Sequence, residues 1–183
     1  MLSHDDEEIT VGEFVEGLWG MRREWGGAAL SEGAAASLSL SELLRYGHFR
    51  GWLEDSDERH PENLLNRQTA ARIINQFMVV ELGVPDIADI SGAEKLRDLY
   101  TCRVCANHVA QVYLRGIMRA QEIDGVDSLE SEGTGAAQSV LLFDHLGRLT
   151  KSEAREAMEG LRSKQPQRVS ELCERTSEDA ERE

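Results

Sequence analysis

The chain has 183 residues and a formal net charge of −14, with 40% hydrophobic and 30% charged residues. This composition is typical of a globular chain that buries a core, and the negative charge argues against nucleic acid or an anionic lipid surface as a partner. No segment approaches the ~20 apolar residues that a membrane-spanning helix needs. We therefore expect no membrane insertion.

The N-terminal residues and the cysteines give information about the cellular compartment of the protein. The first eight residues, 1–8, contain neither the basic region nor the apolar region of a secretory signal, which favours a cytoplasmic location if the chain is complete. There are three cysteines, and two of them are only three residues apart. This pattern does not suggest a scaffold held together by disulfides.

Apolar residues recur at helical spacing along most of the chain, and no alternating pattern marks a strand, so we predict an all-α fold. The first helix is expected from Thr10 to Trp25, with Thr10 as its N-cap and Glu13 as the reciprocal partner in a capping box. Gly26 and Gly27 end this helix. A loop or weak helix rich in Gly, Ala and Ser follows, up to Ser39.

The middle of the chain predicts two further helices. One runs from about Ser41 to Phe49, and an acidic loop follows it. The other is capped by Asn66 and ends near Gly83. It has the clearest apolar stripe in the sequence.

The second half predicts two helices separated by an acidic insertion. The first begins near Ala93 or Asp98 and runs to Leu114, with apolar residues at steps of three and four. Residues 121–138 are mainly Glu, Asp, Ser and Gly, which predicts a mobile insertion. Thr150 caps the last helix of the core.

Three short stretches of the sequence are alike: 9–14, 65–70 and 149–154. Each has an apolar residue, then a capping residue, then a helical run with Ala or aliphatic residues. Upstream of the second and third stretches, 46–52 parallels 111–117, and both contain Arg-Gly followed by a large apolar residue. These likenesses predict an internal helix-loop-helix repeat.

The repeat resembles the S-layer homology (SLH) family, in which the second helix of each repeat begins at an apolar-Thr-Arg-Ala-Glu motif. The resemblance implies three repeats arranged with pseudo-threefold symmetry as a compact bundle. It divides the chain into a partial first repeat at 1–38, a second at 39–92 and a third at 93–164. The remaining residues, 165–183, form a charged tail that we expect to fray.

The resemblance also implies a function without catalysis, in which grooves between repeats bind an anionic bacterial cell-wall polysaccharide and anchor a protein at the cell envelope. Arg67 matches the arginine of the motif and Lys151 keeps its charge, whereas Val11 does not. Gly51 and Gly116 match the turn glycine. The residues expected to bind the polysaccharide are therefore Arg67, Lys151, Gly51, Gly116, Arg50, Arg115 and Trp52. For Trp52, a place in the core and a sugar-stacking role both remain open.

A second motif, Cys102-x-x-Cys105-x-x-His108, invites comparison with zinc and redox sites. On a continuous helix, residues six apart lie ~120° around and ~9 Å along the axis, so Cys102 and His108 do not readily bind one ion. We therefore expect a packed thiol at Cys102, with no metal and no cofactor. No arrangement of nucleophile and base is recognisable, so we do not expect an enzyme.

Two hypotheses from different classes follow. The first is an SLH-like module that binds an anionic cell-wall polymer at the cell envelope. The second is a soluble intracellular helical protein that uses the same scaffold to bind another protein through a groove.

Overall fold

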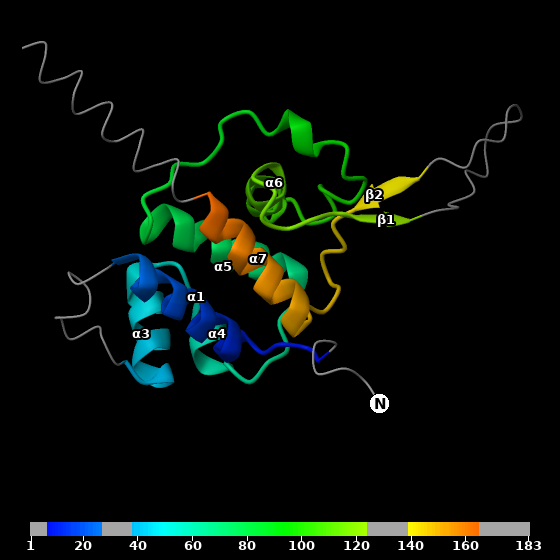
Figure 1. Cartoon of the computed structure of the whole chain (residues 1–183). Helices are drawn as coiled ribbons and strands as arrows, with labels where there is room; N and C mark the ends of the chain where they lie inside the picture. The colour runs from blue at the N-terminus through cyan, green and yellow to red at the C-terminus, as the bar shows by residue number, and fades with distance from the viewer. Residues whose placement is uncertain (1–6, 27–37, 124–138, 165–183) are drawn as a thin grey trace, which may run out of the picture.

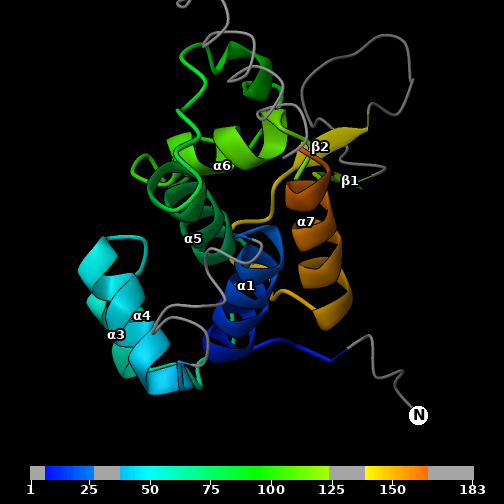
Figure 2. The ribbon, with the colours of Figure 1, turned by 60° about the vertical axis from the view of Figure 1, so that its left-hand side comes forward.

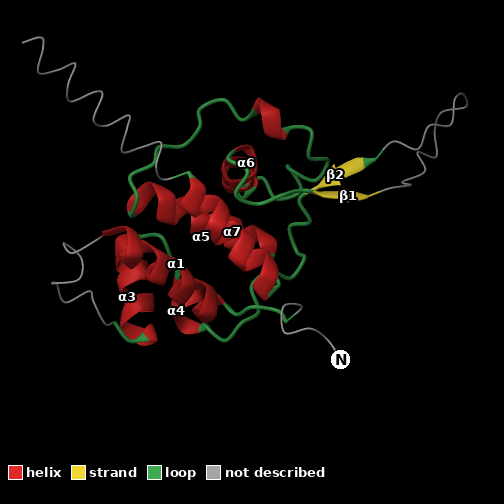
Figure 3. Cartoon of the chain, viewed as in Figure 1, coloured by secondary structure: helices red, strands yellow, loops and turns green. Residues whose placement is uncertain are grey.

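The computed structural model describes residues 7–26, 38–123 and 139–164. The expected Gly/Ala-rich loop, most of the acidic insertion and the charged tail lie outside these ranges. Within them the fold is mainly helical, as predicted, with one small antiparallel sheet (Figure 3). The elements in chain order are α1 Val11–Gly26, α3 Leu40–Arg50, α4 Asp55–Arg59, α5 Arg67–Val80, the 3-10 helix η3 Ser91–Ala93, α6 Ala106–Leu114, β1 Gln121–Ile123, β2 Val140–Leu142 and α7 Lys151–Ser163.

The three predicted N-caps are confirmed. The side chain of Asn66 accepts a hydrogen bond from the amide of Thr69 at 2.8 Å. Thr10 and Glu13 form a reciprocal capping box, and so do Thr150 and Glu153. Each interaction satisfies amides that the first turn of a helix leaves without a partner, so the cap residues define where α1, α5 and α7 begin.

The segments that enter these three helices meet in a closed ring of backbone hydrogen bonds. The amide of Ile9 donates to the carbonyl of Leu149 at 3.0 Å, the amide of Leu149 donates to Leu65 at 2.9 Å, and the amide of Leu65 donates to Ile9 at 2.9 Å. All three side chains are buried. A second set of backbone hydrogen bonds joins the same three segments in the opposite sense. The amide of Val11 donates to the carbonyl of Asn63, the amide of Arg67 donates to Gly147, and the amide of Lys151 donates to Glu7.

From this ring α1, α5 and α7 run side by side through the core (Figures 1 and 2). The helix α6 packs on α5, while α3 packs on both α1 and α4. Phe14, Phe77 and Phe143 are fully buried among these elements. The loop that carries Phe143 is held by Asp98, whose carboxylate accepts hydrogen bonds from the amides of Phe143 and Asp144, both at 2.8 Å.

The turns after α3 and α6 have the same backbone pattern. Gly51 has φ of +86° and Gly116 has φ of +65°, in the left-handed region that glycine adopts without strain. After Gly51, the amides of Trp52 and Leu53 donate to the carbonyl of Gly47. After Gly116, the amides of Ile117 and Met118 donate to Val112. The prediction that these glycines end two helices is confirmed.

The acidic segment expected to be a loop after α3 contains the short helix α4, so that expectation was wrong in part. Two other sequence-based expectations were also wrong. The expected helix from Ala93 or Asp98 to Leu114 is helical only from Ala106, because residues 94–105 form successive turns. Contacts with a distant segment are one reason for these turns. The amide of Arg97 donates to the carbonyl of Leu141 in β2, and the carboxylate of Asp98 accepts a hydrogen bond from the amide of Phe143. The second error concerns strands, since β1 and β2 pair beside the acidic insertion. At three residues each, they are too short to show an alternating pattern.

Candidate functional site

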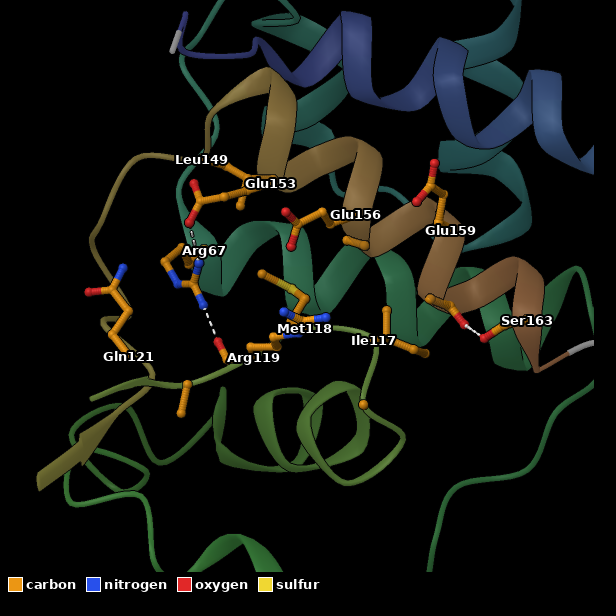
Figure 4. Close-up of a pocket in the computed structure, with 14 residues that line it drawn as sticks. Arg67, Ile117, Met118, Arg119, Gln121, Leu149, Glu153, Glu156, Glu159 and Ser163 are labelled. Carbon is orange, nitrogen blue, oxygen red and sulfur yellow. Dashed lines mark hydrogen bonds and ion pairs between the residues drawn. The ribbon is translucent and has the colours of Figure 1, made fainter. Parts of the chain in front are cut away.

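A groove of about 460 Å³ lies between α7 and the segment 116–121 that follows α6 (Figure 4). One wall is the segment 116–121, and the other is formed mainly by α7, whose lining residues include three glutamates; Arg67, at the start of α5, also lines the groove. The residues that line it are Arg67, Gly116, Ile117, Met118, Arg119, Ala120, Gln121, Leu149, Glu153, Glu156, Ala157, Glu159, Gly160 and Ser163.

One end of this groove depends on a close approach between α7 and the turn after α6. A Cβ atom at Gly160 would lie 3.1 Å from the Cα atom of Ile117 and 3.2 Å from its carbonyl oxygen. Both neighbours are backbone atoms, which do not move aside easily. Glycine at this position therefore allows the two walls of the groove to meet.

Arg67 lies at the other end of the groove and is buried. Its Nε donates to the carbonyl of Phe143 at 2.7 Å, one terminal nitrogen donates to Glu153 at 2.9 Å, and the other donates to the carbonyl of Arg119. The guanidinium also lies 5.1 Å from the centre of the Phe143 ring, within the range of a cation–π contact. Arg67 thus joins α5, α7 and both sides of the groove.

Other polar groups in the groove have no such partner. Among the described residues, the side chains of Arg119, Glu156 and Glu159 take part in no hydrogen bond or ion pair, and all three residues are exposed. Glu153, Glu156 and Glu159 follow one another at steps of three along α7, which places them at neighbouring positions on the helix surface. These unpaired groups are available to a ligand.

The other basic residues predicted for polysaccharide binding lie elsewhere and have acidic or carbonyl partners. Lys151 pairs with Glu7 at 2.8 Å and with Glu13 at 3.3 Å, and hydrogen bonds to these carboxylates raise its pKa. Arg50 pairs with Glu81 at 3.0 Å, a contact that raises the pKa of Arg50.

Arg115 donates to the carbonyl of Pro85 at 2.7 Å, and partial burial lowers its pKa.

The seven predicted residues therefore do not form one site. The groove contains only Arg67 and Gly116 from that set.

Trp52 belongs to the core. It is fully buried and meets the ring of Phe77 edge-on, with the ring centres 5.2 Å apart. Burial removes the face that a sugar would stack on, so of the two alternatives left open for Trp52 the structure supports the place in the core, and the expectation that Trp52 binds the polysaccharide was wrong.

The cysteine motif also differs from the prediction. Cys102 and Cys105 form a disulfide, so Cys102 is not a packed free thiol. The helical argument against a shared metal does not apply, because 102–105 is a turn and α6 begins after it. Even so, no cluster of three or more His, Cys, Asp or Glu side chains suited to a metal ion occurs in the described ranges. His108 lies 3.2 Å from the amide nitrogen of Asn75, and burial lowers its pKa.

The motif comparison gave no indication of Arg119, Glu156 or Glu159. Arg119 lies three residues after the turn glycine, outside any repeated motif. The spacing of the glutamates was visible in the sequence, but such spacing on a helix usually indicates only a solvated surface. Their relevance follows from the segment that packs opposite them.

Searches of protein-family models, curated proteins and solved structures found no match to this chain. No helix in the described part of the chain is long and apolar enough to cross a membrane.

Proposed function

We propose that the chain is an SLH-like module that anchors a protein to the bacterial cell envelope by binding a cell-wall glycan in the groove beside α7. The observation that carries this proposal is the closed ring of hydrogen bonds among Ile9, Leu65 and Leu149. A pseudo-threefold bundle of three repeats requires equivalent segments to meet around one axis in this way. The matching turns at Gly51 and Gly116 support two of the three repeats.

The chemistry of the groove suits a glycan. Carboxylates accept hydrogen bonds from sugar hydroxyls, and Glu156 and Glu159 have free carboxylates there. Arg119 supplies a planar donor for a carboxylate or pyruvyl group on a sugar chain. Arg67 acts indirectly in this proposal, because it holds the carbonyl of Arg119 and the carboxylate of Glu153 in place.

The charge balance narrows the ligand class. Arg67 and Glu153 neutralise each other, which leaves one positive side chain, Arg119, and two negative side chains, Glu156 and Glu159, among the residues that line the groove. A densely charged polyanion would be repelled by this arrangement. We therefore propose a hydroxyl-rich glycan that presents an isolated acidic substituent to Arg119.

Co-sedimentation with isolated Gram-positive cell walls tests this function. We expect the wild-type chain to pellet with untreated walls, and to stay in solution when acid extraction has removed the secondary polymers. Arg119→Ala and Glu156→Gln are expected to weaken pelleting, while Arg45→Ala, which changes an exposed arginine outside the groove, is the matched control. Failure of the wild-type chain to pellet would contradict the proposal, as would equal pelleting by all variants.

One observation favours protein binding on the same scaffold as a second candidate. Phe49, Val104 and Leu146 expose 88%, 85% and 74% of their surface, while most of the predicted polysaccharide-binding cations have internal partners. Such side chains lose unfavourable contact with water when they pack against another protein. This candidate predicts that pelleting survives acid extraction of the walls, is lost after protease treatment of the walls, and is weakened by Phe49→Ser or Leu146→Ser.

A further inference from the structure

The turn before α6 carries a disulfide in a position that solvent reaches. Cys102 and Cys105 are bonded to each other and are both partly exposed. Between them, Arg103 and Val104 are exposed, and Val104 shows 85% of its surface. A dissolved thiol can therefore approach the sulfur–sulfur bond without unfolding of the core.

The two sulfurs differ in their surroundings. Cys105 directly precedes α6, a helix of nine residues, and its carbonyl accepts the hydrogen bond from Val109. Its Sγ lies 3.7 Å from the side-chain oxygen of Gln68, on α5. In the described structure, the amides of Ala106, Asn107 and His108 have no backbone acceptor. Unpaired amides at a helix start stabilise a nearby thiolate, which favours Cys105 over Cys102 as the sulfur that carries negative charge.

We propose that Cys102 and Cys105 form a reversible dithiol–disulfide pair that exchanges with a thiol of low molecular weight. The arrangement combines a short closed turn, exposure to solvent, and a helix start behind one of the two sulfurs. The inference is independent of glycan binding, because the pair does not line the groove.

The exchange balances as two successive displacements. The thiolate of one thiol molecule attacks Sγ of Cys102, the Cys102–Cys105 bond breaks, and Cys105 leaves as a thiolate. A second thiol molecule attacks the mixed disulfide, which releases the oxidised thiol dimer and leaves Cys102 reduced. The protein disulfide gains two electrons and two protons, and two thiol molecules are oxidised to one disulfide.

Glutathione is the probe for the test. The full chain carrying Cys173→Ser, which removes the third cysteine, is equilibrated with a series of reduced and oxidised glutathione mixtures at pH 7. Free thiols are then alkylated and counted by mass, with the wild-type chain measured in parallel and circular dichroism recorded on each sample. We expect two thiols to appear together across the series while the helical signal stays unchanged.

Single variants in the same background test which sulfur leaves. We expect Cys105 in Cys102→Ser to react with iodoacetamide at pH 7 at least about threefold faster than Cys102 in Cys105→Ser. Equal rates, or a faster Cys102, would overturn the assignment of Cys105 as the leaving sulfur.

Two results would overturn the reversible pair itself. The first is that both thiols stay free in fully oxidised glutathione while the chain is folded. The second is that the disulfide is reduced only after urea unfolds the chain, which would make it a structural crosslink. Neither result bears on wall binding, so the two proposals fail separately.

Discussion

The backbone amide of Ile9 donates a hydrogen bond of 3.0 Å to the carbonyl oxygen of Leu149. Each residue precedes the cap of a core helix, and each side chain is buried. Leu65 completes the ring by accepting from Leu149 and donating to Ile9. Three segments far apart in the sequence thus fix the starts of α1, α5 and α7 at one place.

The apolar residues of this ring should be important for stability. Leu65 is 1% exposed and its neighbour Leu64 is 41% exposed. We predict that Leu65→Ala lowers the free energy of unfolding by about 3 kcal/mol, because it removes buried contacts and leaves a cavity. Leu64→Ala is the matched control and should change it by less than about 1 kcal/mol. Urea denaturation measures both, and similar effects of the two variants would contradict a buried ring.

Gly160 should be required for the approach of α7 to the turn after α6. We predict that Gly160→Ala lowers the free energy of unfolding by about 1–3 kcal/mol, because the added methyl meets backbone atoms of Ile117. Gly20, within α1, has no atom within 4 Å of its Cβ position. Gly20→Ala should therefore be neutral or stabilise by up to about 1 kcal/mol, since alanine favours the helix. Thermal denaturation measures the midpoint of unfolding for both variants. We expect Gly160→Ala to lower this midpoint and Gly20→Ala to leave it unchanged or raise it. Equal shifts of the two midpoints would disprove the close approach.

Arg67 should act mainly through structure. We predict that Arg67→Ala destabilises the chain by about 3 kcal/mol, because it removes the charged donor from two carbonyls, those of Phe143 and Arg119, and the positive partner from the carboxylate of Glu153. Arg45→Ala, on an exposed surface, should have little effect. Chemical denaturation gives both values. A stable Arg67→Ala variant that fails to bind walls would instead assign Arg67 a direct role in binding.

The capping box of α1 should stabilise the fold at neutral pH and lose this contribution in acid. The hydrogen bond from the backbone amide of Thr10 is the main factor that lowers the pKa of Glu13, from an ordinary value of 4.5. Because the folded pKa is the lower one, the charged form stabilises the fold above the unfolded pKa, and this contribution is lost as the pH falls through the folded pKa. Glu13→Gln keeps a capping side chain but does not titrate.

The difference in unfolding free energy between the wild type and Glu13→Gln should therefore shrink as the pH is lowered from about 6 to about 3. Urea denaturation across this range measures it. A constant difference would mean that the charge of Glu13 contributes nothing.

Local features of the fold were predictable from the sequence, whereas contacts between distant segments were not. Thr10 and Glu13 are three residues apart, and so are Thr150 and Glu153. Both residues of each capping box therefore lie within one helical turn and can be recognised from the local sequence. The turn glycines Gly51 and Gly116 are likewise recognisable from their local setting.

The partners of Arg67 lie on segments more than 50 residues away, and nothing near Arg67 in the sequence indicates that its charge is already paired. The same limit explains the error over residues 94–105. Apolar spacing predicts a helix there, but the contacts of Asp98 with Phe143 and Asp144 favour turns. A groove lined by Arg119 and Glu156 depends on how such distant segments pack, so the repeat motif alone did not reveal it.

The most direct test of glycan binding is a titration of the ¹⁵N-labelled chain with polymer released from Gram-positive walls, followed by amide chemical shifts. We expect the peaks that move to belong to residues 116–121 and to α7 from Glu153 to Ser163, and we expect Arg119→Ala to reduce these shifts while Arg45→Ala does not. Unchanged spectra at saturating polymer would contradict the proposed function. So would shifts confined to residues around Phe49 and Leu146.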